Sequence, residues 1–223
     1  MQNQSLQMLK QIVKSAFGLF LFSCGVYLTI QADIGLAPWD CLSMGASYHI
    51  VLSYGIVHTG ISILILFIDI LLKEKIGYGT ILDALLVGNY VDLIDRILSL
   101  PKVNSLPLGC VMVVVGLFIM SYGQYFYMSA GQSCGPRDSL LIALGKRFPN
   151  TPIGVVQTVM VGVALCIGWL LGGPVGVGTI ISVFGMGMAL QIVCRLMHFE
   201  PREVHHLNVA EATKLLLGKQ ASA

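Results

Sequence analysis

The chain has 223 residues, of which 56% are hydrophobic and 11% are charged, and its net charge is +2. Soluble domains carry roughly 25% charged residues, and no packed core of this size could hide so much apolar surface, so the composition excludes an ordinary soluble protein. The small net charge argues against a nucleic-acid partner. Because the apolar runs are long and unbroken, they predict an all-α membrane protein instead of a closed β-barrel.

Six apolar runs approach the roughly 20 residues that a helix needs to cross a bilayer. In chain order these runs are Val13–Gln31, Tyr54–Leu72, Tyr78–Leu98, Leu108–Met128, Ile153–Leu171 and Val177–Met197. Two further segments, Pro38–Ile50 and Pro136–Phe148, would form only about 20 Å of helix, which is too short to span. We expect them to be short interfacial or re-entrant helices.

Basic residues near the ends of these runs predict the orientation of the chain. With the N-terminus inside, nine Lys and Arg residues fall in cytoplasmic segments and two fall on the other side. The nine are Lys10, Lys14, Lys73, Lys75, Arg137, Lys146, Arg147, Arg195 and Arg202, and the two are Arg96 and Lys102. We therefore expect a cytoplasmic N-terminus (1–12), two membrane repeats (13–100 and 108–198) and a cytoplasmic tail (199–223).

The two halves of the chain share Gly, Pro, Asp and Thr residues at nearly constant spacing, which chance seldom produces between apolar helices. The offset is 98 residues in the first part of the repeat and 99 residues after a one-residue insertion. The matched segments are Gly18-Leu19-Phe20 and Gly116-Leu117-Phe118, Gly25 and Gly123, Pro38-Trp39-Asp40 and Pro136-Arg137-Asp138, Val57-His58-Thr59 and Val156-Gln157-Thr158, Gly77-Tyr78-Gly79-Thr80 and Gly176-Val177-Gly178-Thr179, and Gly88 and Gly187.

Three crossings per half is an odd number, so the second half must enter the membrane from the opposite side. The expected fold is therefore six transmembrane helices in two inverted three-helix repeats, each with one short interfacial or re-entrant helix. If the two short segments crossed fully, the halves would be parallel, but their length argues against this. Inverted repeats of this kind are typical of secondary transporters.

The two Pro-x-Asp segments are the most distinctive motifs. Proline suits the first position of a helix, and Asp40 and Asp138 then fall in the first turn, near the positive end of the helix dipole. In one interpretation these carboxylates only stabilise two helix ends at the membrane surface. In the other, the helix starts expose amides and a carboxylate to a cavity that binds an ion, a proton or a polar solute.

Arg137 takes the place of Trp39 in the second copy of the motif. It could anchor the chain at the cytoplasmic surface, pair with Asp138 or Asp40, or meet an anionic substrate, and we rank the anchor first.

His58 and Gln157 occupy matching positions near the starts of their helices, and either line a shared cavity or form an interhelical hydrogen bond. Asp83 lies about five residues inside its helix, and a carboxylate within the membrane indicates function by default unless it reaches the interface. Asp69 is expected to form a surface ion pair with Lys73, four residues later. The two Gly-x-Gly-Thr segments are interpreted as helix starts and not as phosphate-binding loops, because no Lys-Ser/Thr follows them.

The sequence contains no Ser-His-Asp grouping, metal-ligand spacing or nucleotide fingerprint, so we expect neither an enzyme nor a bound metal or cofactor. The six cysteines form no CxxC pair and are expected to be packing residues.

The stretch Ala32-Asp33-Ile34-Gly35-Leu36-Ala37-Pro38-Trp39-Asp40, followed by the Gly77-Tyr78-Gly79-Thr80 helix start, resembles bacterial membrane proteins of the YczE/YyaS/YitT type. The likeness spans about residues 13–198. It implies a multi-spanning protein of the bacterial cytoplasmic membrane and supplies no substrate or binding residues.

Our leading hypothesis is a small secondary transporter for a polar solute or ion. Its candidate lining residues are Asp40, Asp138, Arg137, His58, Gln157 and Asp83. The alternative is a non-transporting membrane scaffold or regulator, and a narrow channel is a third possibility. The sequence does not specify the oligomeric state.

Overall fold

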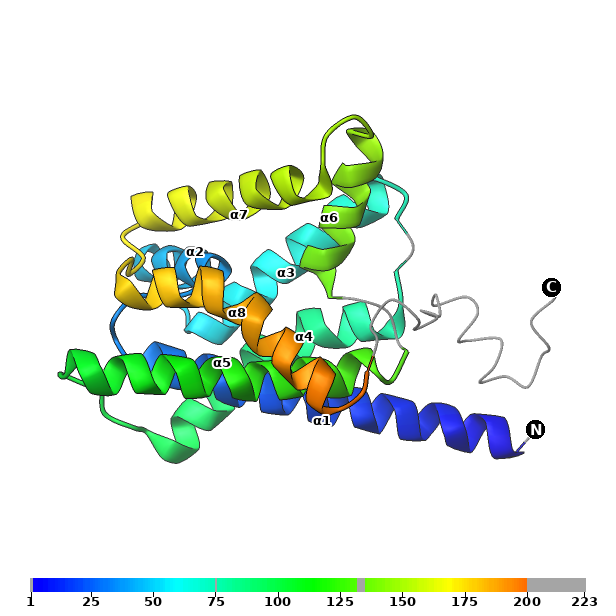
Figure 1. The fold of residues 1–223 in the computed structure, drawn as a ribbon, viewed down its shortest axis with the longest axis horizontal. Coiled ribbons are helices and arrows are strands. Elements are labelled where there is room, and N and C mark those ends of the chain that lie inside the picture. The colour runs from blue at the N-terminus through cyan, green and yellow to red at the C-terminus, as the bar shows by residue number, and fades with distance from the viewer. Residues whose placement is uncertain (1, 75, 132–134, 200–223) are drawn as a thin grey trace.

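The computed structural model describes residues 2–74, 76–131 and 135–199. Within these ranges the chain forms eight α-helices and no strand (Figure 1). The helices are α1 (Gln2–Gln31), α2 (Pro38–His49), α3 (Tyr54–Leu71), α4 (Tyr78–Leu98), α5 (Leu106–Met128), α6 (Pro136–Arg147), α7 (Ile153–Leu170) and α8 (Val177–Leu196). Of the tail predicted at 199–223, residues 200–223 lie outside the described residues.

The long predicted runs coincide with α1, α3, α4, α5, α7 and α8, and the two short segments coincide with α2 and α6. Five helices are long and apolar enough to cross a membrane, namely Met8–Gln31 of α1 together with α3, α5, α7 and α8. The remaining long helix, α4, has 21 residues but carries Asp83, Asp92, Asp95 and Arg96. The chain is therefore a multi-pass helical membrane protein, and the crossing by α4 stays a prediction.

The helix starts follow the motifs in the sequence. Proline occupies the first turn of α2 and of α6, where its missing N–H costs no hydrogen bond. At the starts of α4 and α8 the side chain of the Gly-x-Gly-Thr threonine accepts the amide of the first glycine. Gly77 N–H donates to Thr80 Oγ1 at 3.4 Å, and Gly176 N–H donates to Thr179 Oγ1 at 3.1 Å. This geometry confirms the predicted helix starts.

Glycines bring α1 and α5 into close antiparallel contact. A Cβ added to Gly18 would lie 2.7 Å from the carbonyl oxygen of Gly123, and one added to Gly25 would lie 2.5 Å from that of Gly116. Only hydrogen atoms fit in these gaps, which is how helix backbones approach each other within a membrane. The two helices lie side by side along the lower part of Figure 1.

The molecule has two ends, which we call the Lys102 side and the Lys146 side. On the Lys102 side, Lys102 pairs with Asp33 at 2.9 Å, and the amide of Gly178 donates to the carbonyl of Ile34 at 2.8 Å. On the Lys146 side, Lys146 pairs with Glu74 at 2.6 Å. The short helix α2 lies at the left, on the Lys102 side, and α6 lies at the right, on the Lys146 side (Figure 1).

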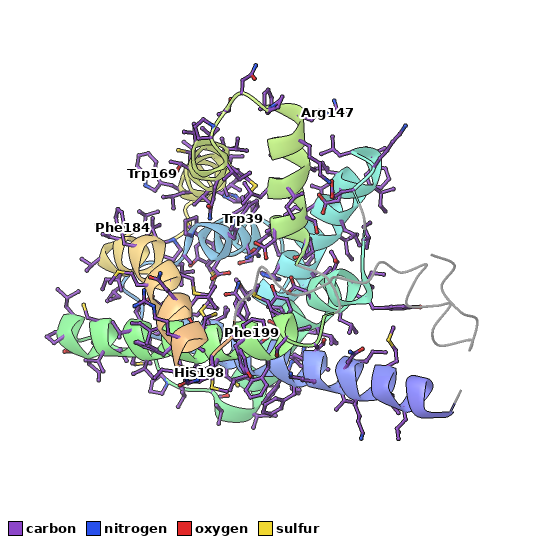
Figure 2. All side chains as sticks on the ribbon, turned by 45° about the vertical axis from the view of Figure 1, so that its right-hand side comes forward. Trp39, Arg147, Trp169, Phe184, His198 and Phe199 are labelled. Carbon is purple, nitrogen blue, oxygen red and sulfur yellow. The ribbon has the colours of Figure 1, made fainter. Side chains whose placement is uncertain are left out.

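The outer surface suits a lipid environment. Trp169 and Phe184 project away from the helices, with exposed fractions of 64% and 72%, whereas Trp39 points into the interior (Figure 2). Large apolar side chains spread over several helix faces are costly in water and favourable in hydrocarbon.

One sequence prediction about α3 is wrong. Asp69 is fully buried, and neither of its carboxylate oxygens has a hydrogen-bond partner within the described part of the chain. It forms no ion pair with Lys73, because α3 ends at Leu71 and Lys73 adopts a left-handed conformation with φ of 61°. The spacing of four residues brings side chains together only while the helix continues.

Candidate functional site

A cavity of about 400 Å³ lies between the two halves of the chain. Helices α1 to α4 line it from the first half, and α5 to α8 line it from the second. This volume falls within the roughly 300–1,000 Å³ range of ligand pockets. Its polar lining residues are His58, Ser62, Asp83, Gln124, Arg137, Asp138 and Gln157.

Five of the six residues singled out from the sequence line this one cavity: His58, Asp83, Arg137, Asp138 and Gln157. The exception is Asp40. Its side chain is 3% exposed, and the hydroxyl of Tyr54 donates to Asp40 Oδ1 at 2.9 Å, so it lies in the packing behind the cavity. The two Pro-x-Asp carboxylates therefore occupy different environments.

Arg137 is the central cation of the cavity. Its Nη2 atom lies 2.6 Å from Nε2 of His58, and its guanidinium carbon lies 5.2 Å from the ring centroid of Trp39. Within the described part of the chain it forms no ion pair with a carboxylate. The interpretation of Arg137 as a surface anchor is therefore not what the structure shows. Near the start of α6 the Arg137 side chain lines the cavity. Arg147 lies at the outer end of the same helix (Figure 2).

The bond to Arg137 determines how His58 is protonated. A guanidinium group has donors and no acceptor, so Nε2 of His58 must accept and the proton of the neutral ring must sit on Nδ1. That Nδ1 atom is buried without a hydrogen-bond partner among the described residues, and the side chain is 4% exposed. The ring packs beside Tyr54, with centroids 5.6 Å apart. His58 therefore holds Arg137 in place from α3.

Two carboxyl groups share the cavity with Arg137. Asp83 comes from α4 and Asp138 from α6, and both lie within electrostatic range of the guanidinium. The side chain of Tyr127 hydrogen-bonds to Asp138. Gly135 packs directly against the end of the Asp83 side chain, so an added Cβ would require the Asp83 carboxylate to shift. The cavity can thus meet both an acidic and a basic group on a solute.

Sequence reasoning missed four residues that shape the site: Trp39, Tyr54, Gln124 and Tyr127. Gln124 offered a signal, because an amide in the middle of an apolar run is costly unless it has a role. Its Oε1 atom is buried and has no hydrogen-bond partner among the described residues. Trp39 and the two tyrosines gave no such signal, because aromatic residues are ordinary packing residues of membrane helices.

An apolar groove of about 600 Å³ adjoins the cavity. Side chains of α3, α6 and α7 form it, and Trp39 and Met160 line both spaces. Its lining is almost wholly hydrocarbon, as expected for a surface that faces lipid chains.

Comparison with known proteins places the chain in a family. The family of unknown function DUF6198 matches residues 9–195. The chain belongs to this family. It is 30% identical over 202 residues to the uncharacterized membrane protein YczE of Bacillus subtilis, covering 88% of each chain. It is 29% identical over 178 residues to the uncharacterized protein YyaS of the same organism, covering 78% of this chain and 88% of YyaS.

An uncharacterized protein of Haemophilus influenzae is 27% identical over 186 residues, which cover 82% of this chain and 84% of that protein. No solved structure matches the chain significantly. The DUF6198 match and the two Bacillus relatives confirm the YczE/YyaS resemblance inferred from the Ala32–Asp40 stretch and the Gly77–Thr80 helix start.

Proposed function

We propose that the protein is a secondary transporter of the bacterial cytoplasmic membrane that carries a small polar solute with an acidic group. In this proposal all six long helices cross the membrane, and the chain consists of two inverted repeats, α1–α4 and α5–α8. Solute would bind in the cavity between the repeats, where Arg137, Asp83 and Asp138 meet.

The glycine contacts between α1 and α5 support the inverted relationship. Gly18 corresponds to Gly116 and Gly25 to Gly123 in the repeat, yet Gly18 contacts Gly123 and Gly25 contacts Gly116. A two-fold axis would produce this crossed pairing, in which residue i contacts j′ and j contacts i′. Because α1 and α5 are antiparallel, that axis would lie in the membrane plane, as in inverted-repeat transporters.

The distribution of charge supports an orientation with the Lys146 side in the cytoplasm. Lys14, Lys73, Lys146, Arg147 and Arg195 lie toward that side, whereas Arg96 and Lys102 lie toward the other. Positive charge accumulates on cytoplasmic segments.

The lack of an ion pair between Arg137 and any described carboxylate is the observation that supports an acidic group on the solute. An arginine that lines an open cavity without an ion-pair partner in direct contact keeps hydrogen-bond donors available to a solute. Arg137 faces a cavity large enough for a solute and forms no ion pair with a described carboxylate. A carboxylate or phosphate group on the solute would bind the Arg137 guanidinium with bidentate hydrogen bonds. Asp83 and Asp138 would then hold a cation or protons that enter with the solute.

The test measures the thermal stability of the purified protein in chloride-poor buffer, alone and with acetate, lactate, succinate, phosphate or sulfate added. The same measurements are made on the Arg137→Gln variant. If Arg137 binds solute, the variant without ligand is as stable as the native chain or more stable, and stabilisation by anions disappears. If Arg137 only balances its own carboxyl groups, its removal destabilises the protein by about 3–5 kcal/mol. That result, with no anion effect on the native chain, would favour the scaffold alternative. Uptake of the stabilising anion into proteoliposomes then measures transport directly.

A further inference from the structure

The two halves of the chain differ in how their last two helices pack. In the first half α3 lies against α4, and a Cβ at either Gly55 or Gly88 would collide with the carbonyl oxygen of the other. The positions 99 residues later are Gly154 of α7 and Gly187 of α8. Neither of these has any atom within 4 Å of an added Cβ in the described part of the chain. The same pair of glycines therefore makes a tight contact in the first half and an open gap in the second.

The gap borders the cavity. Gly187 lines it, together with Gln157 and Met160 of α7 and Val183 and Met186 of α8. Figure 1 shows α7 and α8 diverging from the turn that joins them. Only 17% of α7 is buried, against 39% of α3. On the Lys102 side, by contrast, the Gly55–Gly88 contact and the backbone bond between Gly178 and Ile34 close the bundle.

A polar cap accompanies the closed contact and is missing from the open one. The Ser53 hydroxyl and the Gly55 amide both donate to the carboxylate of Asp92, the latter at 2.8 Å, so α4 caps the N-terminus of α3. The residue that corresponds to Asp92 is Gln191 of α8. Its amide oxygen is able to accept the amide of Gly154 if α7 approaches α8. In the present state no side chain of the described residues caps α7.

We infer that Gly154 and Gly187 form a gate. When Gly55 and Gly88 separate and open the cavity to the Lys102 side, Gly154 and Gly187 come together and close it on the Lys146 side. The inference rests on the proposed inverted repeat, since a two-fold exchange of the two halves converts each packing into the other. Solute would then reach Arg137 from one side of the membrane at a time.

Spin labels placed at lipid-facing positions of the two helix pairs measure this exchange. The pair Ile56 and Leu93 reports on α3 and α4, and the corresponding pair Val155 and Ile192 reports on α7 and α8. Their exposed fractions lie between 43% and 50%, so labels should not disturb the packing. Distances are measured by pulsed electron resonance on the full chain in nanodiscs, with the six native cysteines replaced.

Asp92→Asn weakens the closed contact without adding bulk. We expect it to raise the population with a short Val155–Ile192 distance about five- to tenfold, because a charge-assisted hydrogen bond is weakened. The Ile56–Leu93 distance should lengthen in the same proportion of molecules. Gln191→Asp should act in the same direction, because it supplies a stronger cap for α7. Either variant suffices if the other fails to fold.

Gly187→Leu adds its side chain to the gap of the open state. It should remove the short Val155–Ile192 distance from both the Asp92→Asn and the Gln191→Asp variants. The matched control is Gly162→Leu, which adds the same bulk to α7 at another open position and should leave the distances unchanged. A single long Val155–Ile192 distance in the native chain and in both shifting variants would overturn the gate. The distances need no solute, so exchange without anion binding would contradict only the proposed solute. Anion binding without exchange would contradict only the gate.

Discussion

Arg137 of α6 and His58 of α3 lie 79 residues apart in the sequence, and Arg137 Nη2 lies 2.6 Å from His58 Nε2. This bond connects the two halves directly across the cavity. Together with Trp39, whose ring centroid lies 5.2 Å from the guanidinium carbon, it sets the position of the only described Lys or Arg side chain that lines the cavity.

Replacing His58 should therefore weaken anion binding through Arg137. We expect His58→Leu to reduce the affinity for the stabilising anion about tenfold, which corresponds to about 1.4 kcal/mol. His58→Gln should lose much less, because glutamine keeps an acceptor and is the residue at the matching position 157. Anion-dependent thermal shift measures both variants. His49→Leu, at an exposed position of α2, is the control. Equal losses in the leucine and glutamine variants would contradict a positioning role.

The glycine contact between α1 and α5 should be essential for stability. Gly25→Ala places a Cβ 2.5 Å from the carbonyl oxygen of Gly116, and overpacking of this kind costs about 1–3 kcal/mol. Gly60→Ala adds the same methyl group to α3 in open space and should be neutral, or stabilising by up to about 1 kcal/mol through helix propensity. Thermal unfolding in detergent compares the two. Equal melting temperatures would refute the close packing.

Asp69 should be a source of instability. Its carboxyl group is fully buried with no hydrogen-bond partner among the described residues, and the corresponding position in the second half is Gly168. Asp69→Ala removes an unsatisfied polar group, so we expect the protein to gain about 1–3 kcal/mol of stability. Asp95→Ala is the control, because Asp95 accepts a hydrogen bond from Gln31 and its loss should destabilise. A lower melting temperature for Asp69→Ala would indicate a partner or a role that the packing does not reveal.

The ion pair on the Lys102 side should contribute a small stability that does not change across neutral pH. A hydrogen bond to Asp33 raises the pKa of Lys102 above its usual value, helped by the charge of that carboxylate and opposed by partial burial. When the pKa of a lysine is higher in the folded state than in the unfolded state, the resulting stability is fully present below the unfolded-state pKa. It is lost as the pH rises through the folded-state pKa. The contribution should therefore stay constant across neutral pH and disappear only in strongly alkaline solution.

Both side chains of this pair are more than a third exposed, so Lys102→Ala should cost less than about 1 kcal/mol. Melting temperatures of the native chain and the variant, measured between neutral and alkaline pH, test this. A difference that changes across neutral pH would mean that another titrating group depends on Lys102.

The sequence predicted the helices well because in a membrane the length and polarity of each run decide its structure. The bounds of α2, α6 and the long helices agree with the predicted ones within about two residues, apart from the earlier start of α1. The repeat also paired His58 with Gln157, and of the two alternatives left open for them, both residues line the cavity. Predictions failed where a side chain's direction decides the outcome. The first turn of α6 directs Arg137 inward, and the end of α3 separates Lys73 from Asp69.

The asymmetry between the halves was not predictable from the repeat. Equivalent glycines occur in both halves, so the same pattern is compatible with a closed α3–α4 pair and an open α7–α8 pair. On our inference, the closed pair is set by the balance between the Asp92 cap, which accepts two hydrogen bonds, and its Gln191 counterpart. Sequence patterns specify the contacts that are available, and small free-energy differences decide which of them form.

Side-specific labelling of a cysteine in place of Gln157 tests most directly whether the cavity opens to one side of the membrane at a time. Vesicles of known orientation, with the native cysteines replaced, are treated with a membrane-impermeant maleimide from either face. We predict labelling from the Lys146 side alone in the parent protein, and additional labelling from the Lys102 side after Asp92→Asn. Labelling from neither face, or from the Lys146 side alone in both proteins, would contradict alternating access.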